Sequence, residues 1–478
     1  MAAPTRAGRA RSWALLALAA VGSAALYLVL ALAFPLSHLG LVPRLDLGEL
    51  TGREPPAVLL LLAGLVAVFL LYWLGAVVAR ALSRERFGLP AVLGLGLLLH
   101  LSALLAYPVA ALDVFGYLAQ GNIAALHGAN PFLAPPAAYG GDPLLPLLAW
   151  PEETSNYGAL WGWLSIGISA WAHGDILRGV VLFKLLGVVF SLAMAVAVHR
   201  LMDRQGPEKA LPAALLVAWS PLLVFEVAVN GHNDVVMACL ATVALLSQAR
   251  GRPAVALPSL LASALVKFVS VIYLPAFLLS WLRGHARAGV ARLGLGLLLA
   301  GVLVGVAYGP LWAGLDSLGF LKREGLFTAS PAALTYQLLG GYENPAAAPL
   351  VSIVFGGAFL AVAGWRTWRV SGAWQGLGAA CFDLTLAYLA LGAFWFQPWY
   401  VVLLLPWAVT SGGVRRATGL ALSASAFLNY LVYQFLWFWF VDWLSEPLLQ
   451  ALAVLCIFGP PAVVWLVAGA RRRPALAA

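Results

Sequence analysis

The 478-residue chain is far more apolar than a soluble protein, since 63% of its residues are hydrophobic, 10% are charged and the mean hydropathy is +0.92. Soluble domains carry about 25% charged residues, so the composition excludes a soluble enzyme and a disordered chain and predicts a protein of the lipid bilayer. The net charge of +9 arises from 28 Lys and Arg against 19 Asp and Glu. These cations form small scattered clusters without a basic stripe, so no nucleic-acid partner is predicted.

Apolar runs of about 20 residues, the length of a membrane-crossing helix, recur along the whole chain. They predict an all-α polytopic membrane protein with about 12–14 transmembrane helices in a single integral membrane domain over residues 1–478. The first run exceeds the core of a secretory signal, and we interpret it as a retained anchor. The candidate spans lie near 13–34, 57–80, 89–110, 176–199, 210–228, 234–249, 254–266, 268–282, 290–312, 346–365, 375–394, 399–413, 417–438 and 448–470.

The distribution of Lys and Arg predicts the orientation of these spans. With the N-terminus in the cytoplasm, 21 of the 28 cations fall on the cytoplasmic side, as the positive-inside rule requires. This count needs two short helices that meet near Lys267, because one helix over 254–282 would reverse every later span. We therefore expect a multi-pass plasma-membrane protein with both termini in the cytoplasm.

No Lys or Arg occurs between Arg86 and Arg178, and the second half of this stretch is too interrupted by Gly and Pro to be one span. Residues 111–175 are predicted to form an extracytoplasmic loop with amphipathic helices in the membrane interface. The first of these begins at Asp113 and carries Tyr117 and Gln120 on its polar face. The Asp113 carboxylate is a candidate catalytic group at the outer end of a span, and an ordinary helix cap is the alternative.

A second interfacial helix is predicted to begin near Tyr157 and Trp161. Both residues are candidates for substrate binding, and anchoring in the aromatic belt of the interface is the alternative. Further along, Gln397, Trp399 and Tyr400 form an aromatic wall with one amide, a pattern suited to stacking on a sugar face. Belt anchoring explains the aromatic residues of this wall but not the amide.

The segment 226–234 joins two spans through a turn that is unusually polar for so hydrophobic a chain. Its residues His232, Asn233 and Asp234 suit the binding of sugar hydroxyls or, as a weaker alternative, of a metal, and a helix-capping turn is equally compatible. Asp383 lies inside a predicted span, where an acid is costly unless it faces a polar cavity or a partner.

Few cations lie on the outer side, so the candidates for binding a lipid phosphate can be named. Lys267, Lys322 and Arg323 are the leading ones. For Arg178 and Lys184 we favour side chains that extend to the lipid headgroups.

Five motifs, in this order and with a common outer location, resemble those of polyprenol-phosphate-mannose-dependent mannosyltransferases of the GT-C superfold. The chain is most similar to the bacterial α-(1→6)-mannosyltransferase family of lipomannan assembly, over about residues 90–405. One departure is Ala159 in Tyr157-Gly-Ala-Leu-Trp161, where the family commonly has Pro. The motifs are Asp113-Val-Phe-Gly-Tyr117-x-x-Gln120-Gly121, His127-Gly128-x-Asn130-Pro131-Phe132, Tyr157-Gly158-x-x-Trp161, Asn230-Gly231-His232-Asn233-Asp234 and Gln397-Pro398-Trp399-Tyr400.

The resemblance implies a GT-C-like helical bundle and an inverting transfer of a hexose on the outer face of the membrane. The donor would be a polyprenyl-phosphate sugar, with mannose as the favoured hexose, and the acceptor a hydroxyl of a glycolipid or glycan. Asp113 matches the position of the catalytic aspartate. No cofactor is predicted, although a divalent metal stays open. The alternatives are a lipid-linked sugar transporter or flippase, and a non-catalytic assembly subunit.

Overall fold

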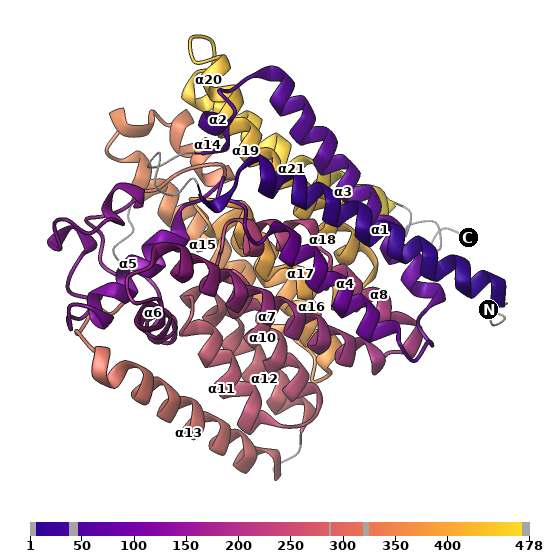
Figure 1. The fold of residues 1–478 in the computed structure, drawn as a ribbon. Coiled ribbons are helices and arrows are strands. Elements are labelled where there is room, and N and C mark those ends of the chain that lie inside the picture. The colour runs from indigo at the N-terminus through magenta and orange to yellow at the C-terminus, as the bar shows by residue number, and fades with distance from the viewer. Residues whose placement is uncertain (1–5, 38–45, 286–287, 319–324, 471–478) are drawn as a thin grey trace. The chain divides into compact units, whose positions relative to one another are not determined.

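The structure is a computed structural model that describes residues 6–37, 46–285, 288–318 and 325–470. Within these ranges the chain is helical, with no regular strand (Figure 1). It divides into two compact units, the first Met1–Val271 with Leu295–Lys322 and the second Ile272–Gly294 with Arg323–Ala478. Two elements of the described chain cross this division along their length, η5 (Phe268–Tyr273) and α13 (Ala288–Tyr308).

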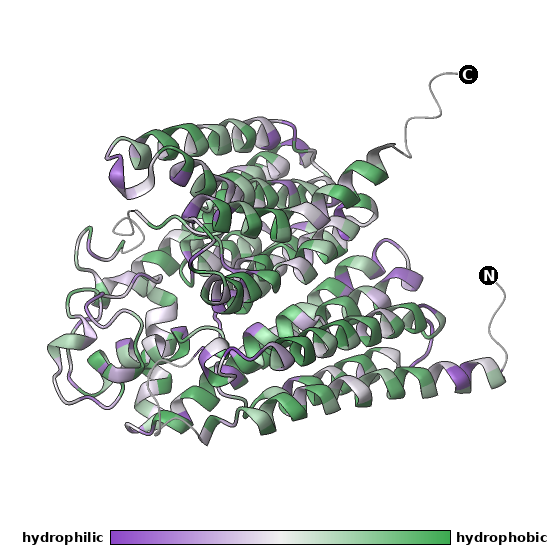
Figure 2. Cartoon of the chain, turned by 90° about the horizontal axis from the view of Figure 1, so that it is seen from above, coloured by the Kyte–Doolittle hydropathy of each residue, from purple (hydrophilic) through white to green (hydrophobic). Residues whose placement is uncertain are grey.

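Eight helices of the described chain are long and apolar enough to cross a bilayer. Apolar runs adopt helices in lipid because a helix satisfies all its backbone hydrogen bonds internally. Figure 2 shows these helices as mostly hydrophobic along their length, with hydrophilic residues in loops and near helix ends. The protein is thus a multi-pass membrane protein, as predicted. The eight are Arg6–Ala33, Pro55–Ala81, Ile176–Asp203, Pro207–Val229, Gly289–Leu311, Ala347–Trp368, Gly413–Trp439 and Glu446–Ala468.

In the first unit, the N-terminal helices pack as a group against α8, and buried side chains tie them to backbone carbonyls. Tyr72 donates to the Leu216 carbonyl at 2.6 Å, and Trp219 donates to the Val92 carbonyl at 2.9 Å. The helix α7 packs against both α8 and α10, and α10 packs against α11. The elements are α1 (Arg6–Ala33), α2 (Leu47–Leu50), α3 (Pro55–Ala81), α4 (Gly88–Ala103), α7 (Ile176–Asp203), α8 (Pro207–Ala218), α9 (Pro221–Val224), α10 (Asp234–Ala249) and α11 (Pro253–Ala264).

The predicted outer loop contributes α5 (Asp113–Ala125) and α6 (Ala159–Ala172), which pack closely together. A Cβ atom at Gly121 would lie 2.2 Å from Ser169 Oγ and 2.4 Å from the Ser165 carbonyl, so only glycine permits this approach. α5 also contacts α7, and its buried residues lie on both of its faces. On the polar face expected from the sequence, Tyr117 is buried, whereas Asp113 and Gln120 are half-buried.

Two interruptions of helices position polar residues. The predicted break near Lys267 is confirmed, because α11 ends at Ala264 and the chain continues through η5 (Phe268–Tyr273) before α12 (Leu274–Gly284). The span that contains α8 and α9 ends in a π-helical turn, η4 (Phe225–Val229). Such turns are rare and frequently occur at functional sites.

In the second unit, Asp383 on α16 is held by two arginines. Arg366 Nε donates to it at 2.6 Å, and Arg415 donates through Nε at 2.8 Å and Nη2 at 2.9 Å. The sequence predicted that this acid faces either a polar cavity or a partner. The structure shows that it has partners, the two arginines. The elements of the unit are α12, α14 (Pro331–Leu338), α15 (Ala347–Trp368), α16 (Trp374–Ala387), η9 (Tyr388–Gly392), η10 (Pro398–Leu403), α17 (Leu405–Ser411), α18 (Gly413–Ser425), α19 (Leu428–Leu431), η11 (Val432–Leu436), α20 (Trp437–Trp439) and α21 (Glu446–Ala470).

Candidate active site

Asp113 is the first residue of α5, but it does not serve as a helix cap. The capping position belongs to Leu112, and no side chain caps this helix. The Asp113 carboxylate instead accepts a hydrogen bond from the Tyr157 hydroxyl at 3.1 Å. Its side chain is 27% exposed. The carboxylate is therefore oriented by a neighbour and still accessible to a ligand.

His232 lies between two carboxylates. Its Nδ1 is 3.9 Å from Asp113 Oδ2, and its Nε2 is 3.5 Å from Glu226 Oε2. Burial lowers the pKa of His232 to about 3, which outweighs the opposing effect of the Asp113 charge. The ring is therefore neutral near pH 7. A neutral imidazole carries one N–H and one lone pair, so it can donate a hydrogen bond to only one of the two carboxylates.

The turn that carries His232 is tied to the chain just before α5. Asn230 donates through Nδ2 to Glu226 Oε2 at 2.9 Å, and its Oδ1 accepts from the Ala110 backbone N–H at 3.2 Å. Gly231 has a φ of +78°, and a Cβ atom there would lie 3.0 Å from Val114. The backbone conformation therefore favours a glycine, and the close approach of Val114 leaves little room for a side chain.

Asp234, the first residue of α10, forms an ion pair with Lys267. The Lys267 Nζ lies 2.9 Å from both carboxylate oxygens of Asp234. The Asp234 side chain is 1% exposed and that of Lys267 is 17% exposed. Lys267 also lowers the pKa of His232, so the ion pair and the His232 cluster act on each other electrostatically.

Aromatic rings form the wall behind Asp113. The Tyr117 ring meets the rings of Tyr157 and Trp161 edge to face, with centroids 5.1 and 5.0 Å apart. Burial raises the pKa of Tyr117 well above its ordinary value, so this phenol stays protonated. All three residues are buried, which differs from belt anchoring in contact with lipid. The Trp161 Nε1 has no hydrogen-bond partner in the described part of the chain.

The Tyr157-Gly158 motif connects the surroundings of Asp113 to the segment that carries Lys267. The Gly158 N–H donates to the Val266 carbonyl at 3.2 Å, one residue before Lys267. A Cβ atom at Gly158 would lie 2.2 Å from the Leu265 carbonyl oxygen. The glycine thus lets the segment that carries Tyr157 lie directly against the segment that carries Lys267.

We expect Gly158→Ala to destabilise the protein, because the clash is with backbone atoms that cannot rotate away. The expected loss is about 1–3 kcal/mol in the free energy of unfolding. Thermal unfolding in detergent measures it. The matched control is Gly167→Ala in α6, where an added Cβ atom meets nothing within 4 Å and a helical alanine is favoured. Equal melting temperatures for both variants would contradict this account of Gly158.

The first unit brings together Asp113, Tyr157, His232, Asp234 and Lys267. Asn233, in the same turn, is 1% exposed, and neither amide atom has a hydrogen-bond partner among the described residues. Gln120 is half-buried on α5. The remaining predicted residues lie elsewhere: Gln397, Trp399 and Tyr400 belong to the second unit, around the start of η10, and Lys322 and Arg323 fall outside the described residues.

Two charged residues at the site differ from the sequence expectation. Glu226 was not a candidate, yet it is fully buried and contacts both His232 and Asn230. Lys184 does not extend to headgroups, because it is fully buried and donates to the carbonyls of Leu104 and Ala106 at 3.2 and 2.6 Å. The sequence contained a signal for both residues. Each is a charged residue within an apolar run, where an unpaired charge is costly.

Residues 11–283 match the family model described as alpha-(1->6)-mannopyranosyltransferase, N-terminal domain. The match covers more than half of the chain and includes every residue of the cluster around Asp113 and Lys267.

Three curated relatives show the same likeness. A probable alpha-(1->6)-mannopyranosyltransferase of Mycolicibacterium smegmatis is 30% identical over 237 residues, or 49% of this chain and 40% of the relative. Alpha-(1->6)-mannopyranosyltransferase A of Corynebacterium glutamicum is 26% identical over 185 residues, 38% of this chain and 37% of the relative. A Mycobacterium tuberculosis alpha-(1->6)-mannopyranosyltransferase is 30% identical over 141 residues, which are 29% of this chain and 24% of the relative. The alignments thus span less than half the length of these relatives.

Proposed function

The chain belongs to the alpha-(1->6)-mannopyranosyltransferase family, and from this premise we propose that it transfers a mannosyl residue from a polyprenyl-phosphate donor. The acceptor is a hydroxyl of a glycolipid or glycan on the outer face of the plasma membrane. The observation that carries the proposal is the Asp113 carboxylate, which is accessible and oriented by Tyr157 inside the family-matched region.

The proposed reaction is a single displacement with inversion. Asp113 takes the proton of the acceptor hydroxyl as its oxygen bonds to the anomeric carbon of the donor. The bond between that carbon and the phosphate oxygen breaks, and its electron pair leaves with the polyprenyl phosphate. A positioned general base typically contributes about 10²–10⁴-fold to such a step. The phosphate is already a good leaving group, so it needs cations rather than an acid.

Cations and polar groups around Asp113 support this assignment. Lys267 is the proposed ligand of the donor phosphate, held in place by the Asp234 carboxylate. Lys322 and Arg323 are proposed to supply further positive charge. Asn233 has buried amide atoms suited to a sugar hydroxyl. The proposed sugar-binding set is completed by Tyr117, Gln120, Tyr157, Trp161, His232, Asp234, Gln397, Trp399 and Tyr400.

A transfer assay tests the donor class directly. The purified protein in nanodiscs is incubated with a mannoside acceptor and, in separate reactions, with polyprenyl-phosphate mannose, polyprenyl-phosphate glucose and GDP-mannose. We expect product from polyprenyl-phosphate mannose only, with inverted anomeric configuration by NMR. Transfer from GDP-mannose, or a product with retained configuration, would contradict the proposal.

A further inference from the structure

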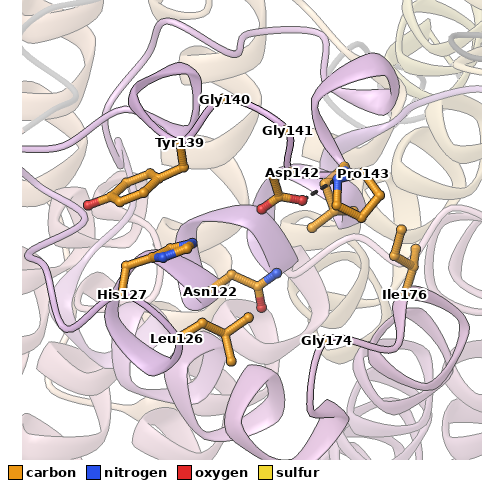
Figure 3. Close-up of a pocket in the computed structure, with 11 residues that line it drawn as sticks. Asn122, Leu126, His127, Tyr139, Gly140, Gly141, Asp142, Pro143, Gly174 and Ile176 are labelled. Atoms are coloured by element: carbon orange, nitrogen blue, oxygen red, sulfur yellow. Dashed lines mark hydrogen bonds between the residues drawn. The ribbon is translucent and has the colours of Figure 1, made fainter.

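The first unit contains a cavity that the residues of the cluster around Asp113 do not line. It measures about 370 Å³ and lies between the end of α5, the segment 139–144 and the start of α7 (Figure 3). This volume falls in the range of about 300–1,000 Å³ that is typical of small-molecule sites. None of the residues assigned to the transfer reaction lines it.

The cavity presents one buried amide and one acid. Asn122 is 4% exposed, and its Oδ1 has no hydrogen-bond partner in the described chain. In Figure 3 its side chain extends from α5 into the space beneath Asp142. The Asp142 Oδ1 accepts from the Leu144 N–H at 2.8 Å, which fixes the carboxylate at the rim. An orphaned buried amide oxygen is costly, so it indicates a site built for a hydroxyl donor.

A flat aromatic pair forms another wall of the cavity. The rings of His127 and Tyr139 are stacked, with centroids 4.1 Å apart and planes inclined by 13°. Tyr139 is half-buried and His127 is exposed, so the pair can offer both ring surface and polar edges to a ligand. Flat rings next to hydrogen-bonding side chains are suited to a sugar, which has apolar C–H faces and polar hydroxyl edges.

Charge at the cavity excludes the phosphate of the donor as its ligand. Its lining contains no Lys or Arg, and none occurs between Arg86 and Arg178 in the sequence. The Asp142 carboxylate at the rim repels anions. The lining therefore disfavours an anion and is compatible with a neutral ligand that carries hydroxyl groups.

The position of the cavity relative to Asp113 limits which part of a substrate can occupy it. Asn122 follows Asp113 by nine residues on α5, which corresponds to about 13 Å along the helix axis and two and a half turns. Its side chain therefore leaves the helix on the side opposite to Asp113. A single sugar is too short to reach both places, whereas an oligosaccharide of several units is long enough.

We propose that this cavity binds a sugar residue of the acceptor glycan, several units away from the hydroxyl that is glycosylated. The inference rests on the proposed transferase function and adds to it a subsite that discriminates acceptors by length. It assigns Asn122 and Asp142 to the sugar hydroxyls, and His127 and Tyr139 to the sugar face.

The test compares a short and a long acceptor. We expect Asn122→Leu and Tyr139→Ala each to raise KM for a linear manno-oligosaccharide about tenfold, the effect of losing one buried polar or stacking contact. The kcat value and the KM for methyl mannoside should stay unchanged. Tyr342→Ala is the matched control, because Tyr342 is 82% exposed and lies in the second unit. An unchanged KM for the oligosaccharide, or an equal rise for both acceptors, would overturn the subsite.

A binding measurement separates failure of the subsite from failure of the transferase proposal. Saturation-transfer NMR of the oligosaccharide is recorded with wild-type protein in nanodiscs without donor. Titration of this signal gives a dissociation constant, which we expect to be the same for the wild type and for Asp113→Asn and about tenfold higher for Tyr139→Ala. If these binding results are obtained but the wild-type protein transfers no mannose, the transferase proposal alone is refuted. An unchanged dissociation constant in both Tyr139→Ala and Asn122→Leu would refute the subsite alone.

Discussion

Asp113→Asn is expected to lower kcat for transfer by about 10²–10⁴-fold while the protein inserts and folds normally. The amide has nearly the same shape and can still accept from the Tyr157 hydroxyl. It cannot, however, take the proton of the acceptor. The measurement is the rate of labelled mannose transfer from polyprenyl-phosphate mannose, with thermal unfolding recorded in parallel.

The matched control for Asp113 is Asp175→Asn, a change of the same kind in the same predicted outer loop. Asp175 caps α7 by accepting from the Arg178 N–H at 2.9 Å, and asparagine caps a helix about as well. This variant should retain wild-type activity. Full activity in Asp113→Asn would remove Asp113 from the mechanism, and equal losses in both variants would indicate a general effect of charge on the loop.

Lys267→Met is expected to destabilise the protein strongly, because it leaves the Asp234 carboxylate buried without its cation. Breaking a buried ion pair costs about 3–5 kcal/mol, and we expect the lower end because Lys267 is 17% exposed. Thermal unfolding measures this loss. The double variant Asp234→Asn with Lys267→Met should recover most of it, since no unpaired charge remains.

The same double variant separates the structural role of Lys267 from its proposed phosphate contact. If Lys267 binds the donor phosphate, the double variant has a KM for polyprenyl-phosphate mannose at least tenfold above that of Asp234→Asn alone, which controls for the proposed sugar contact of Asp234. The KM for the acceptor should change little. A double variant with wild-type stability and a wild-type donor KM would show that the ion pair serves only the fold.

Several features of the fold followed from hydropathy alone. Each predicted span coincides with a helical segment, because a long apolar run in lipid has no other way to satisfy its backbone. The break near Lys267 was predictable from the charge balance on the two sides of the membrane. The closeness of Asp113, Tyr157 and His232 agreed with motifs shared with a known family, although these residues are far apart in sequence.

Partners of the charged residues were not predictable in the same way. Asp234 pairs with Lys267 across 33 positions, and Asp383 pairs with Arg366 and Arg415 across 17 and 32. Such pairs depend on how each helix is rotated about its axis and where it begins. Hydropathy averaged over an apolar run carries almost no information on either quantity, since every face of such a helix is hydrophobic.

By itself the sequence determined that this protein lies in a bilayer and where its helices are, because these depend on composition and local residue order. Only the tertiary structure decided that His232 lies between Asp113 and Glu226, that Lys184 is buried, and that Asn122 faces a separate cavity. These depend on close packing between distant segments. In particular, the glycines at 121 and 158 let backbones approach to distances that any other residue would prevent.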